Sequence, residues 1–410
     1  MFILVDILLL IVVGFFFLYL AMLSVLAFFA QPKKGFQTSR RRLFAVVIPA
    51  HNEQLVIEKT VRSLFAIDYP QELFEVIVVA DNCSDKTAEI ARSLAATVYE
   101  REDTFLRGKG QALRWCFDRL LDSGRGYDAC VVVDADSEVS SNLLLVLNRY
   151  LEDGARVIQI ADVVKPQPGA WNSEIIRLAF TLYNVVRPMG KKLIGCSAGL
   201  RGNGMCFSTE TLRKVPWHAY SLTEDLEYGL ILLLHDIDVV FAPEATVAAA
   251  MPAESKHSQT QRARWEIGRF PVIKKYVPLL LKETVRKKSF KLFDAFIDVV
   301  MPPIVNMLIV VWAIVAVHLA LLMLGNKEVL VFCLLWCMAV LFGVTHIFAG
   351  MIAAKADRSL FKALLYIPQY ALWKILLYLK LAIKGKPQEW VRTTREHQEA
   401  QMQKSLLERR

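Results

Sequence analysis

The amino end of the chain is a long apolar segment. Residues 2–30 carry a single charged side chain, Asp6, and they exceed the roughly 20 residues that a membrane-spanning helix needs. Basic residues follow this run, whereas in a secretory signal peptide they would precede it. We therefore expect a retained transmembrane anchor at residues 1–31.

Two further apolar segments, at 304–324 and 329–354, are separated by a four-residue turn and predict a transmembrane hairpin. The segment at 360–383 is also long enough to span, but it contains Pro368 and several lysines. We expect it to lie along the interface as an amphipathic helix, with a further span as the alternative. The resulting C-terminal membrane region covers 290–383 and is followed by a basic tail at 384–410.

Between the membrane segments, short β-branched runs alternate with helical patterns, which is typical of βαβ units and a mostly parallel sheet. Each run is almost uniformly apolar, as in strands buried on both faces. The strands are expected at 44–48, 74–80 and 129–133, and helices at 53–66, 86–95, 110–121 and 142–152. This α/β domain is expected to cover 43–280, with functional residues at the carboxyl ends of its strands.

The second half of this domain, from about 159 to 276, has a more mixed pattern. It predicts an amphipathic helix over 171–187, a glycine-rich loop, a short strand at 205–208 and two further helices. We expect this half to supply contacts to an acceptor.

Charge places the domain relative to the membrane. The chain has a net charge of +9 and is 55% hydrophobic, and basic clusters follow the anchor and precede the hairpin. By the positive-inside rule the domain and the tail are cytoplasmic, in a multi-pass protein of the cell or inner membrane that contacts anionic membrane lipids. No stretch interleaves basic and aromatic residues as a nucleic-acid groove would, so we expect no nucleic-acid partner.

Acidic residues follow the first two predicted strands. Glu53 comes after the first strand and Asp81 ends the second, and carboxylates at such positions can bind a ribose hydroxyl or a base N–H. Ser84 and Asp85 have an equally good interpretation as helix N-caps. Further on, Arg107–Gly110 opens a helix with flexible backbone and a cation, which suits a diphosphate, although glycines at helix starts are common.

Two later motifs carry candidate metal and proton-transfer chemistry. Asp134 and Asp136 follow an apolar strand and can hold Mg²⁺ or Mn²⁺, although such pairs also occur by chance. A metal here would need carboxylate ligands, because the seven cysteines show no zinc spacing. Glu224 and Asp225 begin a helical pattern after Thr223, where a carboxylate can take a proton from a sugar hydroxyl or simply belong to a capped first turn.

A last motif, Gln261-Arg262-Ala263-Arg264-Trp265, lies in a predicted helix. Gln261, Arg264 and Trp265 share one face of it, presenting an amide and a guanidinium for a diphosphate beside an aromatic plane. The alternative is a membrane-interface anchor.

Together, these motifs in this order resemble the inverting GT-A glycosyltransferases of family 2, in particular membrane synthases of the cellulose, hyaluronan and chitin-oligosaccharide type with TED and QxxRW motifs. The resemblance covers about residues 43–280. It implies a Rossmann-like GT-A fold, a UDP-sugar donor, Mg²⁺ or Mn²⁺, and direct inversion without a covalent intermediate.

The resemblance also implies roles for individual residues. Binding of the nucleotide-sugar falls to Pro49, Glu53, Asp81, Lys109, Asp134, Gln261, Arg262 and Arg264. Asp136, with Asp134, resembles the metal ligand, and Asp225, with Glu224, the catalytic base. The acceptor site would comprise Trp265 and the loop Gly202-Asn203-Gly204. Asn82 departs from the pattern, because the family often has a second acidic residue there.

The implied product is a growing β-linked poly- or oligosaccharide. Polymer-secreting relatives usually have more spans than the three expected here, whereas ceramide glucosyltransferases, which also resemble the chain, add one sugar to a lipid. Single transfer to a membrane lipid is therefore the alternative, and a non-catalytic nucleotide-binding scaffold is a remote one. An export partner or a homo-oligomer stays open.

Overall fold

The computed structural model describes residues 2–30, 32, 35, 36, 38–166, 171–249 and 255–384, with backbone alone for 2, 3, 172, 255–267 and 377–384. These residues fall in two compact units. The membrane-helix unit lies within 1–31, 168–195 and 297–389, and the sheet unit within 32–167 and 196–296.

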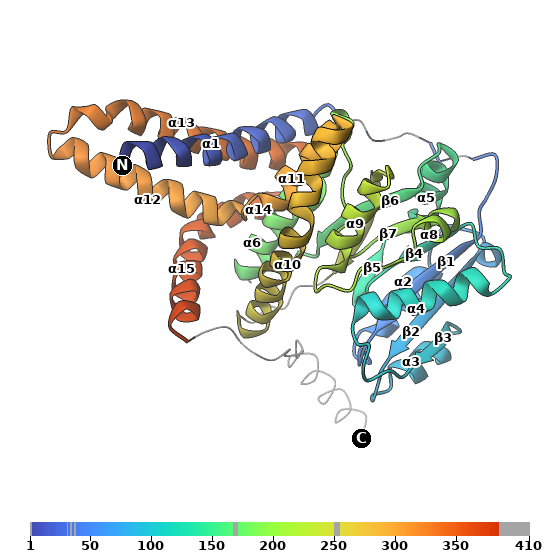
Figure 1. The fold of residues 1–410 in the computed structure, drawn as a ribbon. Helices are drawn as coiled ribbons and strands as arrows, with labels where there is room; N and C mark the ends of the chain where they lie inside the picture. Colours follow the sequence, from blue (N-terminus) through green and yellow to red (C-terminus); the bar gives the residue numbers. More distant parts are fainter. Residues whose placement is uncertain are drawn as a thin grey trace, which may run out of the picture. The chain divides into compact units, whose positions relative to one another are not determined.

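The sheet unit is built on one eight-stranded sheet (Figure 1). Its strands are β1 Phe44–Ala50, β2 Phe74–Asp81, β3 Thr97–Arg101, β4 Ala129–Val132, β5 Ser137–Val139, β6 Val157–Val164, β7 Met205–Ser208 and β8 Val239–Ala249, in the order β3-β2-β1-β4-β7-β6-β8-β5. Strands β3, β2, β1 and β4 are parallel, β7 is antiparallel to both β4 and β6, and β8 is parallel to β6 and antiparallel to β5.

Helices cover both faces of this sheet, as the apolar strands require. The helices of this unit are α2 Ile57–Phe65, α3 Thr87–Ser93, α4 Lys109–Asp122, α5 Leu143–Glu152, α8 Thr209–Lys214, α9 Glu224–Leu234 and α10 Ser255–Lys287. The first face packs against α2, α3 and α5 in one large apolar core. On the other face, Phe117 of α4 and Tyr228 of α9 join Phe207 and Trp217 in a cluster of edge-to-face and tilted rings.

The strand directions bring the carboxyl ends of four strands to one edge of the sheet. Because β7 is antiparallel to β4 and β6, the carboxyl ends of β1, β2, β4 and β6 meet at the edge where β7 begins. The helix predicted from Glu53 begins only at Ile57, because residues 51–54 form a turn in which Asn52 has a φ of +56°. Those turn residues are thereby left at the same edge.

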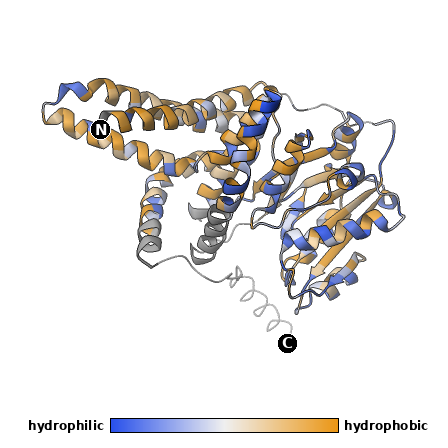
Figure 2. Ribbon diagram, in the orientation of Figure 1, coloured by the Kyte–Doolittle hydropathy of each residue, from blue (hydrophilic) through white to orange (hydrophobic). Residues whose placement is uncertain are grey.

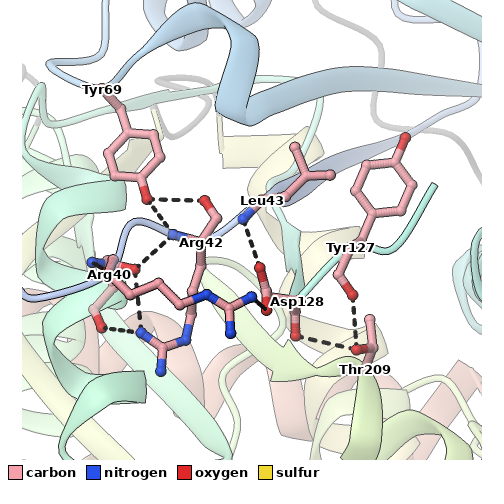
Figure 3. Close-up of polar contacts among 8 residues, drawn as sticks. Arg40, Arg42, Leu43, Tyr69, Tyr127, Asp128 and Thr209 are labelled. Atoms are coloured by element: carbon pink, nitrogen blue, oxygen red, sulfur yellow. Dashed lines mark hydrogen bonds and ion pairs between the residues drawn. The ribbon is translucent and has the colours of Figure 1, made fainter.

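The opposite edge of the sheet is closed by hydrogen bonds around Asp128 (Figure 3). Its carboxylate accepts from the Leu43 backbone N–H at 2.9 Å and from Nη2 of Arg40 at 2.8 Å. Thr209 Oγ1 donates to the carbonyl oxygens of Tyr127 and Asp128, and the Tyr69 hydroxyl bonds to the backbone of Arg42. These contacts hold the amino ends of β1 and β4 and leave the other edge for a ligand.

The membrane-helix unit contains α1 Phe2–Ala27, α6 Trp171–Phe180, the π-helical turn η2 Thr181–Val186, α7 Arg187–Leu193, α12 Ile304–Met323, α13 Leu330–Ala353, α14 Arg358–Ala363 and α15 Ile367–Lys384. In the described part of the chain, three helical segments are long and apolar enough to cross a membrane: Leu4–Ala27, Ile304–Met323 and Lys327–Ala353. They run side by side and are apolar along almost their whole length (Figure 2). They indicate association with a membrane.

Asp6, the one charge in the first apolar segment, is paired inside this bundle. Its carboxylate accepts from Nε1 of Trp336 at 2.9 Å and lies 3.3 Å from Nε2 of His318. Farther along α1, the Ser24 hydroxyl lies 2.6 Å from Nδ1 of His346. Polar side chains thus link α1 to both helices of the hairpin.

In sequence, residues 171–193 lie between β6 and β7 of the sheet unit, but they belong to the membrane-helix unit. They form α6, η2 and α7, whereas the sequence predicted one helix that ended at Arg187. A Cβ on Gly190 would lie 2.3 Å from the Leu23 carbonyl oxygen, so α7 touches the backbone of α1. The cationic groups of Arg187 and Lys191 both pair with Asp298, at 2.8 and 2.9 Å.

Candidate active site

Lys109 is the centre of the candidate site. Gly108, at a φ of +106°, turns the chain into α4, and Lys109 is the first residue of that helix. Its Nζ donates to Asp134 Oδ1 and to the Gly202 carbonyl oxygen, both at 2.5 Å, and lies 3.8 Å from Glu224 Oε1. The ammonium therefore joins the loops around β4 and β7 to the start of α9.

The charges around Lys109 influence one another. Removal from water alone would lower the pKa of Lys109, but Asp134 and Glu224 outweigh this effect and raise it. Burial raises the pKa of Glu224 to about 7, and it also raises the pKa of Asp225. Two adjacent carboxyl groups with raised pKa values, in a site with a cation, are typical of acid–base catalysis.

Asp162 of β6 is a further carboxyl group at this site, which the sequence did not predict. It is 6% exposed. Burial raises its pKa well above the ordinary value, and the charge of Asp134 adds to the effect. The signal was present in the sequence as an acidic residue within the apolar run Val157–Val164.

The loop Gly202-Asn203-Gly204 supports the acidic residues. Gly202, at a φ of +84°, lies against Asp225, because a Cβ there would come within 3.2 Å of Asp225 Oδ2. Asn203 is buried, and its side chain accepts from the Asp134 N–H at 3.0 Å and donates to Ser137 Oγ at 2.8 Å. Ser137 in turn donates to Asp136 Oδ1 at 3.3 Å. Asn203 therefore orients both aspartates.

Gln159 of β6 fixes that loop and was also not predicted. Its Nε2 donates to the Asn203 carbonyl oxygen at 2.7 Å, and its Oε1 accepts from the Arg201 N–H at 2.9 Å. It is fully buried, so both ends of its amide have partners within the protein.

The donor set suits a hard divalent cation. Asp134 and Asp136 offer carboxylate oxygens, while among the described residues no three His, Cys, Asp or Glu side chains are grouped to hold a metal ion by themselves. Mg²⁺ sites of this kind take one or two carboxylates and complete the shell with water and substrate phosphates. The residues present therefore fit a cation that binds together with a diphosphate.

The predicted nucleoside contacts lie at the ends of β1 and β2. Pro49 stands beyond Val47, the last β1 residue paired with β4, so its missing N–H breaks no bond to that strand. The Glu53 backbone N–H donates to Thr87 Oγ1 at 2.8 Å. Asp81 is 6% exposed and forms an ion pair with Arg101 at 2.6 Å, a partner that the sequence did not predict.

Neither Asp85 nor Ser84 is the N-cap residue of α3, contrary to their structural alternative, because that position is Lys86; both nevertheless have partners within the protein. Its Oδ1 accepts from the Thr87 N–H at 3.0 Å, at the start of α3, and its Oδ2 accepts from the Gln54 N–H at 3.2 Å. Ser84 donates its backbone N–H to Asn52 Oδ1 at 2.7 Å. Both residues therefore stabilise the turns between strand and helix.

Thr223 does not cap α9 with its side chain, contrary to the structural alternative for this motif. Its hydroxyl donates instead to the Gly268 carbonyl oxygen of α10 at 3.2 Å. A Cβ on Gly268 would lie 3.0 Å from Leu222 and 3.2 Å from Thr223, so the two helices touch closely. The turn that carries Glu224 and Asp225 is therefore fixed to α10.

Gln261, Arg262, Arg264 and Trp265 lie on the backbone of α10, at most seven residues before Gly268. Their side chains are outside the described part of the structure, so their predicted roles stay predictions. The residues that the structure does bring together are Lys109, Asp134, Asp136, Asp162, Gly202, Glu224 and Asp225.

Comparison with known proteins finds related glycosyltransferases. A family model described as glycosyltransferase-like family 2 matches residues 41–268. The β-monoglucosyldiacylglycerol synthase of Trichormus variabilis is 27% identical over 58% of this chain and 51% of its own, so the chain spans about half the length of that relative. The probable glycosyltransferase YdaM of Bacillus subtilis is 24% identical over 86% of this chain and 87% of its own.

Among solved structures, a mannosyltransferase of Pyrobaculum calidifontis in complex with GDP-Man and Mn²⁺ is similar with a TM-score of 0.52 and 17% identity. The likeness covers 85% of this chain and 97% of the other. It supports the GT-A fold. Because the family model covers more than half of the chain and includes the whole acidic edge of the sheet, the chain belongs to glycosyltransferase-like family 2.

Proposed function

We propose that this glycosyltransferase moves one sugar from a UDP-sugar to a membrane lipid, with inversion at the anomeric carbon. The observation that carries the transferase chemistry is the set of acidic groups around Lys109. It combines a place for a diphosphate and cation, at Asp134 and Asp136, with a buried carboxyl pair at Glu224 and Asp225.

In the proposed reaction, the Asp225 carboxylate accepts the proton of the acceptor hydroxyl while the oxygen of that hydroxyl bonds to the anomeric carbon. The bond from that carbon to the nucleoside diphosphate breaks, and UDP leaves with the electron pair. Lys109 holds Asp134 in place, and the glycine at position 202 lets the loop backbone pack closely against Asp225. A bound Mg²⁺ or Mn²⁺ would neutralise the charge that develops on the leaving diphosphate.

The lipid acceptor is favoured by two observations. Two relatives that match 58% of this chain bear the name β-monoglucosyldiacylglycerol synthase, and the described chain has three candidate spans. Extension of a β-linked poly- or oligosaccharide is the second candidate, because the sequence resembles the polymer synthases. In both cases the chain would be a multi-pass membrane protein with its sheet unit in the cytoplasm.

Membranes that contain the protein should be incubated with a panel of radiolabelled UDP-sugars, and the products divided into organic-extractable and polymeric fractions. A single labelled glycolipid in the organic fraction is the expected result. Label in a polymer would favour the second candidate. Membranes with the Asp225→Asn protein provide the matched background, and equal label in both samples would contradict a transferase role for this site.

A further inference from the structure

A buried arginine holds the strand end that carries Asp81. Arg101, the last residue of β3, is 5% exposed, and its Nη1 donates to Asp81 Oδ1 at 2.6 Å. Its Nη2 donates to Asp103 Oδ2 at 3.0 Å and to the Leu106 carbonyl oxygen at 2.6 Å. One guanidinium thus joins the ends of β2 and β3 to the loop that leads to Lys109.

The loop itself, residues 102–107, is fixed by side chains. Asp103 Oδ1 accepts from the backbone N–H groups of Phe105 and Leu106 at 2.9 and 2.8 Å. The Asp103 N–H donates to Asn82 Oδ1 at 2.9 Å, and Asn82 Nδ2 donates to Asp81 Oδ1 at 3.0 Å. Asn82 has a φ of +50°, a conformation that asparagine tolerates better than most residues.

These contacts leave the two oxygens of Asp81 in different situations. The hydrogen bonds from Arg101 and from Asn82 both end on Oδ1. Oδ2 is therefore the oxygen that can meet a ligand, and an ionised carboxylate can only accept hydrogen bonds. Uracil presents a donor at N3 and cytosine an acceptor at the same place, so Oδ2 attracts the first base and repels the second.

We propose that Arg101 is a positioning residue through which this site distinguishes a uracil nucleotide from a cytosine nucleotide. The inference rests on the proposed function, which takes Asp81 as a nucleoside contact. Nη1 of Arg101 holds Oδ1 of Asp81, and Nη2 is itself held by Asp103 and by the Leu106 carbonyl oxygen, so the planar guanidinium ties this carboxylate to the loop and leaves Oδ2 for the base. Without these contacts the carboxylate can turn, and either oxygen or a water molecule can meet the base.

The test is a pair of equilibrium binding measurements, UDP and CDP, on the full-length protein in detergent with Mn²⁺. The wild type should prefer UDP by about 10-fold or more, the range for one charge-assisted hydrogen bond. Arg101→Gln should reduce the ratio of the two affinities to within about threefold, and Arg101→Lys, which keeps the charge but not the fork, should give an intermediate ratio. Arg92→Gln is the matched control, because Arg92 pairs with Glu100 of the same strand at a half-exposed position.

The ratio separates positioning from a merely structural role. Loss of local structure lowers the affinities for UDP and CDP by the same factor and leaves their ratio as in the wild type; that result in both Arg101 variants would overturn the proposal. If Arg101→Gln does not fold, the ratio measured for Arg101→Lys decides, since an unchanged ratio there also overturns the proposal.

If the donor is not a UDP-sugar, the nucleotide preference of the wild-type protein shows it, before any Arg101 variant is measured. A wild-type protein that binds UDP and CDP equally well excludes both Asp81 as a base contact and the role of Arg101. A wild-type preference for GDP excludes the uridine donor alone. Arg101 is then tested by GDP against ADP, because guanine N1 is a donor and adenine N1 an acceptor.

Discussion

Two neighbouring carboxyl groups, Glu224 and Asp225, have different surroundings. Glu224 lies 3.8 Å from the Lys109 ammonium, which also holds Asp134. Asp225 lies against Gly202, and the charges of Lys109 and Arg201 act on it. Because the Lys109 ammonium lies close to Glu224, and because Asp225 has the position of the base in the family that the motif resembles, we propose that Asp225 removes the proton.

Asp225→Asn should reduce turnover by a factor of about 10² to 10⁴, the usual range for loss of a general acid or base, with UDP affinity nearly unchanged. Glu224→Gln is the matched control and should cost less, because Glu224 contacts the protein's own lysine. Turnover of purified variants and equilibrium binding of UDP provide the two readouts. Near-normal turnover of Asp225→Asn, or a larger loss in the control, would place the base elsewhere.

The pH profile follows from the same burial. Because burial raises the pKa of Glu224 to about 7 and also raises that of Asp225, the pair takes up protons at a higher pH than exposed carboxyl groups do. The base must be ionised to act, so kcat/KM should fall about 10-fold per pH unit on the acid side of the apparent pKa of the pair.

Glu224→Gln should move this limb to lower pH, because it removes a neighbouring negative charge. Measurements of kcat/KM at constant ionic strength check both statements. A profile that is flat from about pH 5.5 to pH 8 would contradict them.

Asp136 should be needed for the metal and not for the fold. Asp136→Asn should abolish activity and weaken Mn²⁺ binding while leaving the thermal unfolding midpoint unchanged, because a hard anionic ligand is replaced by a neutral amide. Asp118→Asn, at a half-exposed position paired with Arg114, is the control. Full turnover in excess EDTA would refute metal dependence.

Among the secondary-structure elements, the sequence predicted four strands with uninterrupted apolar runs and missed the others, including the buried β6, whose run contains Gln159 and Asp162. β1, β2, β4 and β7 appear where their apolar runs predicted. β3 was missed because it is short and contains Glu100 and Arg101. β8 was missed because Pro243 interrupts it, and in the structure Pro243 falls in the break of the β6–β8 ladder, between the pairs Ile160–Ala242 and Ala161–Thr246.

Dependence on local sequence pattern also explains which parts of the site could be predicted. Asp81, Lys109 and Asp134 follow strands or open a helix, so local pattern was enough to find them. Gln159 and Arg101 act through partners that lie farther away in the sequence, Asn203 for Gln159 and Asp81 for Arg101. Hydrogen bonds of this kind depend on the order of strands in the sheet, which local periodicity does not determine.

α10 carries the last prediction at this scale. If the Trp265 ring stacks on the acceptor, Trp265→Ala should sharply impair transfer while UDP affinity and slow hydrolysis of the donor by water persist, and Trp265→Phe should restore part of the rate. The contact of Gly268 with Leu222 and Thr223 fixes this helix to the turn of Asp225, which favours the acceptor role.

Transfer assays, donor hydrolysis and membrane extraction of each Trp265 variant distinguish the two roles. If Trp265 is an interfacial anchor, the Trp265→Ala protein should be extracted more easily from membranes and yet keep its rate of sugar transfer per folded molecule. That result would remove the stacking role.

In the whole molecule, Asp6 should act as an interhelical contact in the bundle. Asp6→Ala should lower the free energy of unfolding by about 0.5–2 kcal/mol, because Trp336 and His318 lose their shared partner among apolar helices. Thermal unfolding in detergent of Asp6→Ala, Trp336→Phe and the double variant gives the coupling energy. Trp312→Phe, at an exposed position of α12, is the control. Additive single effects would show that the hydrogen bond contributes nothing.

The contacts of α1 are with helices that are synthesised much later than α1. α1 precedes its partners along the chain: His346 follows Ser24 by 322 residues, and α7, whose Gly190 packs on Leu23, follows six strands of the sheet. During synthesis, Asp6 and Ser24 therefore gain their partners in α12 and α13 only after the residues of the candidate active site have been made.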